Sequence, residues 1–362
     1  MPITAGSIAR ADDFINRATA NATPSNDAGR VPKLEADGKF SSQWFLDGFG
    51  NNTDGTVLLD GTNTFASFLS KSGNTYTMLR NMYAGTLTIN SGVTLETDGF
   101  MIFAETITGA GKVKGKTGNN GSNGAANVGT TGGIGGAGGT SSGTGPLKTT
   151  AGANGSNGTN TTGGNAGGNG DDIAAIFKFY GNAAANGGRG YSWNGATGTL
   201  TVPAGVGQPI TSTKYSINFK RNKFETLNVM EFDEATALFK RIFLNGAAGG
   251  GAGGGSSTAQ AGGGGGGAGA SGGPVFIYAK NWSGTFTIES IGGNGGTGAG
   301  GTGGGGGAGG NGGTSVVMYH NKTWTGSYAL TAGTGAAGGT NAEAGTNGNA
   351  GAQYEIKIED LF

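Results

Sequence analysis

Glycine tracts with a period of three are the feature that most constrains what this chain can fold into. Residues 295–313 read GGTGAGGTGGGGGAGGNGG, which is fourteen glycines in nineteen positions. Ordering one residue costs about 1–2 kcal/mol of backbone entropy, and glycine loses more freedom than any other residue type. Either these tracts are flexible linkers, or a regular backbone structure offsets the cost.

The positions of the larger residues favour the second alternative. Two sets of them each keep one phase of a three-residue repeat: Val128, Thr131, Ile134, Ala137 and Thr140, and Ala299, Thr302, Ala308 and Asn311. A polyproline II helix has three residues per turn and directs its N–H and C=O groups outward, where neighbouring helices can bond them. We therefore predict bundled threefold glycine helices (polyglycine II), with the phased side chains on the outer face or against a neighbouring sheet.

An internal repeat connects the tracts to short apolar segments. A glycine-rich tract precedes each of four such segments, at 172–181, 274–280, 314–321 and 352–358. The second and third copies align as a unit of about 41 residues, which matches Tyr278 with Tyr319, Trp282 with Trp324 and Gly284 with Gly326. This pattern predicts glycine helices interleaved with β-hairpins.

The sequence before the tracts is typical of β-structure. Short β-rich pieces (TLTI, VTLE, FMIF and KVKG) recur about every eight residues within 85–115, as in a β-solenoid or a sandwich. Apolar residues at helical spacing in 231–243 predict one short helix. The predicted fold class is all-β with polyglycine II. Its expected parts are an attachment or assembly segment (1–54), a β-rich domain (55–114) and a glycine-helix sandwich (115–362) with a larger β insertion at 171–245.

Composition excludes several functions. The 22 basic and 22 acidic residues leave no net charge for binding nucleic acid, and the lack of cysteine excludes disulfides and thiolate metal sites. With a single histidine, His320, an activated nucleophile has no base, so we expect no enzyme and no cofactor. The N-terminus has no recognisable secretory signal, and no apolar run is long enough for membrane insertion.

Two sequence motifs contain residues that could bind a ligand. The segment AGKVKGKT (110–117) resembles a phosphate-binding loop, but that motif requires glycine where this chain has Ala110. The pairs Asp12–Asp13 and Asp171–Asp172 offer hard oxygen ligands for a cation, yet Asp171 fits equally well as a turn residue between tract and strand. We therefore predict no metal site.

Residues 28–45, AGRVPKLEADGKFSSQWF, resemble a segment common in phage tail-fibre and other virion proteins. That segment has the form Gly-x-Val-Pro-x-Leu followed by glycine and an aromatic or aliphatic residue. The resemblance implies attachment to other virion or fibre proteins. The attachment candidates are Val31, Pro32, Leu34, Phe40 and Trp44.

Residues 115–351 resemble, in architecture and not in identity, the glycine-helix sandwich of T-even-like phage long-tail-fibre adhesins. Members of that family are usually shorter and lack a β-rich leader. Their glycine helices form a rigid lattice, and loops at its distal tip bind the bacterial receptor. The resemblance implies a non-enzymatic, homo-oligomeric adhesin, located in the virion or outside the cell, whose partner is a host surface protein or glycan.

Aromatic residues in Gly/Ser/Asn turns are the candidate receptor contacts, because their rings supply rigid contact area with a polar handle. The alternative is that the rings pack in the core. The turns 281–284 and 322–326 are expected at one end of the bundle, with 188–198 as a third member. The receptor-binding candidates are Tyr191, Trp193, Trp282, Trp324, Tyr328 and His320.

Two other functions compete with adhesion. A structural subunit of an extracellular filament or capsid fibre would self-associate through its glycine-rich faces. The snow-flea antifreeze proteins are also built from bundled glycine helices, and similarity to them would imply ice binding. Those proteins carry disulfides and are almost wholly glycine-rich, whereas this chain has no cysteine and about half of it is ordinary β sequence.

Overall fold

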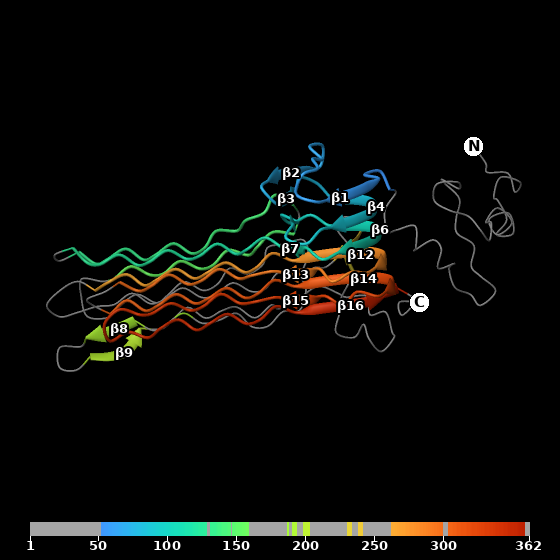
Figure 1. Cartoon of the computed structure of the whole chain (residues 1–362). Helices are drawn as coiled ribbons and strands as arrows, with labels where there is room; N and C mark the ends of the chain where they lie inside the picture. Colours follow the sequence, from blue (N-terminus) through green and yellow to red (C-terminus); the bar gives the residue numbers. More distant parts are fainter. Residues whose placement is uncertain are drawn as a thin grey trace, which may run out of the picture.

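A computed structural model describes residues 52–128, 131–145, 147–158, 187, 190–193, 198–202, 230–233, 238–241, 262–299 and 303–358. These residues form strands and extended segments, and no α-helix occurs among them. The strands of the two large sheets gather at one end of the molecule, and glycine-rich segments extend side by side away from them (Figure 1). The all-β prediction is therefore confirmed for the described residues.

Two six-stranded sheets form the strand-rich end. Sheet 1 is parallel throughout and contains, in spatial order, β1 (Thr56–Leu59), β4 (Met82–Ile89), β6 (Ile102–Gly109), β12 (Val275–Trp282), β14 (Ser315–Lys322) and β16 (Gln353–Lys357). Sheet 2 contains β15 (Ser327–Ala329), β13 (Thr287–Glu289), β7 (Lys112–Lys114), β5 (Thr94–Glu96), β3 (Thr75–Met78) and β2 (Leu69–Ser72). Only the β2–β3 pair of sheet 2 is antiparallel.

From β3 onward, consecutive strands of the two large sheets alternate between them, so the chain winds as a β-solenoid. β4, β6, β12 and β14 lie in sheet 1, and the strand that follows each of them lies in sheet 2. The connections are therefore arches between sheets, and the prediction of β-hairpins at 274–289 and 314–329 is wrong. Gly284 allows the tight arch after β12 because its φ is +89°, and its carbonyl accepts the N–H of Thr325 in the next arch.

The hydrophobic core lies between the two sheets and crosses the expected domain boundary. β6, from the N-terminal part, pairs with β12, from the glycine-rich part, so both sheets continue beyond residue 114. One cluster of buried side chains includes Met82, Ile107, Ile277 and Trp282. Residues 55–114 and the later strands thus share one core, because each sheet adds its strands from both parts of the sequence.

The repeat between β12 and β14 is 40 residues and not 41. Val275 pairs with Ser315 and Asn281 with Asn321, so Tyr319 stands opposite Ala279. The aromatic match predicted from the sequence is therefore displaced by one position at Tyr319 and by two at Trp324. Backbone pairing sets the register here, and it brings Trp324 onto Trp282 from the arch that follows β14.

The glycine-rich segments, which we call runs, are joined by backbone hydrogen bonds with a period of three. In run 262–273 successive N–H groups donate to three neighbouring runs in turn, over 2.8–3.0 Å. The acceptors are Ala125, Ser156 and Gly305 for residues 264–266, Ser122, Ala153 and Ala308 for 267–269, and Asn119, Thr150 and Asn311 for 270–272. Carbonyls of this run accept bonds from two further runs, 133–139 and 293–299.

Burial follows the same period. Run 262–273 is buried at every position, whereas in run 131–140 every third residue faces solvent. The exposed residues of that run are Thr131, Ile134, Ala137 and Thr140, which are the side chains whose shared phase predicted one outer face. In the other phased set, Ala299, Ala308 and Asn311 are buried between runs.

The predicted helix is wrong as well. The segment expected to form a helix, 231–243, contains two antiparallel strands, β10 (Met230–Asp233) and β11 (Leu238–Arg241), with Phe232 opposite Phe239. Short apolar segments fit helical and alternating spacing almost equally well, which explains the error. The segments 1–50, 159–186 and 242–261 lie outside the described residues.

Candidate functional site

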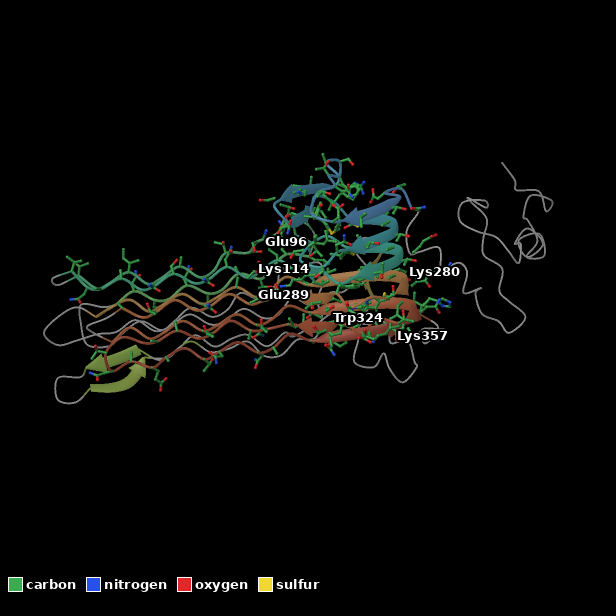
Figure 2. The ribbon with its side chains drawn as sticks, in the orientation of Figure 1. Glu96, Lys114, Lys280, Glu289, Trp324 and Lys357 are labelled. Atoms are coloured by element: carbon green, nitrogen blue, oxygen red, sulfur yellow. The ribbon has the colours of Figure 1, made fainter. Side chains whose placement is uncertain are left out.

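Three of the receptor-binding candidates meet near one edge of the two sheets. Trp282 comes from the end of β12, Trp324 from the arch after β14, and Tyr328 from β15. The indoles of Trp282 and Trp324 stack with centroids 4.5 Å apart and planes at 20°, and Tyr328 meets Trp324 edge-on at 5.1 Å. Figure 2 shows Trp324 within the strand-rich end and not at the tip of the runs.

Both tryptophans are core residues, so the expectation that they contact a receptor is wrong. Trp282 is 0% exposed and Trp324 is 7% exposed. The indole N–H of Trp324 donates to the carbonyl of Phe286 over 3.0 Å, and the Trp282 Nε1 is buried without an acceptor among the described residues. Their similar positions in two repeats reflect a shared role in filling the space between the sheets.

Polar side chains cover this aromatic cluster. The Lys322 ammonium lies over the rings of Trp282 and Trp324, 4.8 and 5.5 Å from their centroids, and pairs with Glu355 on β16. Glu355 also accepts the Tyr328 hydroxyl over 3.0 Å. Burial raises the pKa of the Tyr328 phenol well above its usual range, and the Glu355 charge adds to the effect. The phenol is therefore a neutral donor, and the network fastens β16 to its neighbours.

The remaining candidates do not join this cluster. His320 is half-buried in β14, between Tyr319 and Asn321. Tyr191 and Trp193 belong to β8 (Gly190–Trp193), which pairs with β9 (Gly198–Val202) at the far end of the runs (Figure 1). Of the three turns expected at one pole, the two arches are joined by backbone bonds, but the third segment lies at the opposite end.

The attachment candidates Val31, Pro32, Leu34, Phe40 and Trp44 lie outside the described residues. The aspartate pairs at 12–13 and 171–172 lie outside them as well. Within the described part of the chain, no group of three or more His, Cys, Asp or Glu residues is placed to hold a metal ion. No described helix is long and apolar enough to cross a membrane.

A charged cluster joins sheet 2 to the start of the first glycine-rich run, residues 115–128. Lys116 Nζ lies 2.6 Å from Glu96 Oε1 and 2.9 Å from Asp98 Oδ1, and the other oxygen of Asp98 accepts the Thr144 hydroxyl over 2.6 Å. Charges also alternate across sheet 2, where Glu96, Lys114 and Glu289 occupy one row of paired residues (Figure 2). These groups satisfy one another, so the cluster has a structural role.

The sequence analysis missed the role of asparagine in the runs. Among the described residues, seven backbone N–H groups on run surfaces donate to an asparagine Oδ1 of a neighbouring run, over 2.8–2.9 Å. The donor and acceptor pairs are 135 with 157, 138 with 154, 294 with 120, 297 with 123, 334 with 294, 335 with 347 and 349 with 311. The signal was the spacing of three between Asn120 and Asn123 and between Asn154 and Asn157.

A scan against protein-family models and searches of curated proteins and of solved structures found no match for this chain. What the arrangement can do is therefore argued from its own residues. The described clusters are closed networks of side chains that bond one another.

Proposed function

We propose that the runs form a polyglycine II lattice, in which each interior helix bonds neighbours in several directions. The single observation that carries this proposal is the order of the hydrogen bonds donated by run 262–273. Successive N–H groups donate to a first, a second and a third neighbouring run, and the sequence then repeats. A threefold helix directs successive peptide groups about 120° apart, which is the order expected of polyglycine II. The close approach of backbones also favours Cα–H···O contacts.

On this basis the chain is a non-enzymatic structural adhesin of a virion, a phage tail-fibre or receptor-binding protein. Backbone bonds in several directions stiffen the lattice without a core of side chains, and a stiff scaffold lowers the ordering cost of binding at its end. The resemblances at 28–45 and 115–351 support a place in a fibre, with other virion proteins, further copies of the chain and a host surface protein or glycan as partners. Its location is then the virion or the extracellular space.

Because Trp282 and Trp324 are buried, the proposed recognition site moves to the far end of the runs. The β8–β9 pair lies there (Figure 1), and β8 contains the candidates Tyr191 and Trp193. Val128, close to the connection at 129–130, is 80% exposed. The aromatic residues of β8 and the exposed apolar residues of this end are the groups assigned to host recognition.

The test compares a tip variant with a core variant. Purified parent protein, a Tyr191→Ala/Trp193→Ala variant and a Trp282→Phe variant are applied to a panel of bacterial strains and to a glycan array. We expect the tip variant to lose binding with unchanged circular dichroism, and Trp282→Phe to keep it. Equal binding by all three proteins would contradict the tip assignment. Capture of the parent on none of the surfaces, with long polymers in negative stain, would instead favour the filament.

A further inference from the structure

The outer face of run 131–140 carries backbone donors that no other described run uses. The N–H groups of Gly133, Gly136 and Gly139 donate to run 262–273. Those of Gly135 and Gly138 donate to asparagine side chains. The N–H groups of Ile134, Ala137 and Thr140 have no acceptor among the described residues, and these three residues are exposed.

Residue type in this run follows the direction in which each position points. The two inward phases are glycine throughout, and the outward phase consists of Thr131, Ile134, Ala137 and Thr140. A Cβ added at Gly136 would overlap the carbonyl of Ser122, and one added at Gly267 would overlap the carbonyl of Ala137. A side chain at Gly136 or at Gly267 would therefore keep the backbones of two neighbouring runs apart.

Run 262–273 shows the composition of a run that has neighbouring runs on all sides. Its residues are glycine, alanine and one serine, and it bonds five neighbouring runs among the described residues. Run 131–140 differs from that composition only at its outward phase. Its N–H groups without a described acceptor, at Ile134, Ala137 and Thr140, recur every third residue. Bonds between the runs recur with the same spacing, so an additional run could accept them.

We propose that the four outward side chains of run 131–140 end the lattice, and that without them this face binds the same face of a second copy of the chain. Antiparallel contacts of this kind already occur within the molecule, where Ser122 and Ala125 donate to Ala137 and Ile134. A two-fold axis would pair two such faces in the same way. The inference rests on the lattice proposed above and is independent of the receptor-binding role.

The experiment removes only the Cβ atoms of this phase. The full chain is prepared as the parent, as the variant T131G/I134G/A137G/T140G, and as the matched control T131S/I134S/A137S/T140S, which also loses the isoleucine but keeps every Cβ. Sedimentation velocity over a range of concentrations should show a larger, concentration-dependent sedimentation coefficient for the glycine variant alone. Negative stain should show its rods side by side.

The sign of the effect separates this mechanism from ordinary hydrophobic association. Ile134 is 69% exposed, so association through apolar surface would be strongest in the parent and weaker in both variants. Association of the glycine variant alone has no such explanation. A folded glycine variant that sediments like the serine control would overturn the proposal.

Two further measurements keep every outcome informative. If the fourfold glycine variant does not fold, the smaller variant I134G/A137G is compared with I134S/A137S in the same way. Failure of both glycine variants to fold would also overturn the proposal, because it assigns these side chains to solvent and not to folding. Amide exchange of the parent tests the lattice separately: runs as unprotected as free peptide contradict both proposals, whereas protected runs without association contradict only this one.

Discussion

The solenoid and the glycine-rich runs belong to one continuous chain but are held together in opposite ways. In the solenoid each strand bonds at most two neighbours, and large buried side chains such as Trp282, Phe286 and Ile277 fill the space between the sheets. In the runs the backbone bonds neighbours in several directions, and at glycines such as Gly136, Gly267 and Gly306 an added Cβ would overlap the backbone of a neighbouring run. The same Cβ atom therefore stabilises one region and would disrupt the other.

This contrast shows that glycine content alone does not indicate flexibility. Run 262–273 has almost no side-chain volume, yet every one of its residues is buried. Hydrogen bonds and close backbone contact replace hydrophobic burial as the source of order. The strands β12 and β14, each entered directly from a run, mark the change from one mode to the other.

The largest effect should come from placing a branched side chain inside the runs. Gly306 donates to Glu343, and a Cβ at this position would overlap the carbonyl of Ala336. We expect Gly306→Val to lower the free energy of unfolding by about 5 kcal/mol, from overpacking and broken buried hydrogen bonds. Denaturant unfolding of the full chain measures the change.

The control places the same side chain at a solvent-facing position of the adjacent run. Ala337 is exposed, so Ala337→Val should change the stability by less than about 0.5 kcal/mol. A similar loss of stability in the two variants would contradict the claim that the direction in which a residue faces, and not the glycine content of its run, decides whether a valine is tolerated.

The next largest effect tests the solenoid side of the comparison. Trp282 is fully buried, stacks on Trp324 and lies beneath the Lys322 ammonium. Trp282→Ala should cost about 3–5 kcal/mol, because it removes a large buried side chain and leaves a cavity. Leu79→Ala, at a residue that is 50% exposed, is the control and should have little effect. Thermal unfolding, followed by the fluorescence of the remaining tryptophans, measures the change. A Trp282→Ala protein as stable as the parent would contradict the prediction.

Sequence reasoning identified those elements whose signal is local. Strands β12, β14 and β16 were predicted because each is an apolar segment that follows a glycine tract, and the outer face of run 131–140 was predicted from the shared phase of its larger residues. The apolar side chains occupy consecutive positions in 275–278 and in 316–319. That pattern is typical of parallel strands buried on both faces.

What sequence reasoning missed depends on contacts between distant segments. An arch and a hairpin have similar turns, and only the pairing of β12 with β6 and β14 distinguishes them. For the same reason the sequence does not distinguish an exposed aromatic turn from a buried one, so both receptor contact and core packing stayed open for Trp282 and Trp324. The asparagine bonds join runs far apart in the sequence, although their spacing of three was visible.

A smaller, pH-dependent effect is expected where the two regions meet. Burial alone would raise the pKa of Asp98, but hydrogen bonds from Thr144 and Lys116, together with the Lys116 charge, lower it below its usual value. The unfolded chain then takes up the proton at higher pH than the folded chain. The stabilisation by ionised Asp98 is therefore complete above the ordinary aspartate pKa and is lost as the pH falls through the lowered value.

Asp98→Asn removes this titration. Its deficit in melting temperature relative to the parent should be largest near neutral pH and should shrink in acid. Parallel melting curves from neutral to acidic pH measure both proteins. Glu105→Gln, at an exposed carboxylate of β6, serves as the control for general acid effects. A deficit that stays constant across this range would show that the Asp98 charge does not couple the first run to the sheets.

The smallest effect is expected at the surface of the runs, where asparagine side chains complete the backbone bonding. The N–H groups of Gly138 and Gly135 donate to Oδ1 of Asn154 and Asn157 over 2.8 Å. Asn154→Ala should cost about 1 kcal/mol, the usual value of one such bond, and should speed amide exchange at Gly138 while leaving Gly135 unchanged.

Asn157→Ala should do the reverse, and Asn154→Asp, which keeps an acceptor oxygen, should restore most of the protection at Gly138. Thr331→Ala, at an exposed position of another run, is the neutral control. Uniform loss of protection along run 131–140 in either alanine variant would mean that the asparagines hold the run as a whole. A loss of protection confined to one glycine would mean that each outer N–H group is bonded by its own asparagine. Bonds of this kind would let the runs end at a solvent-facing surface without leaving backbone donors unpaired.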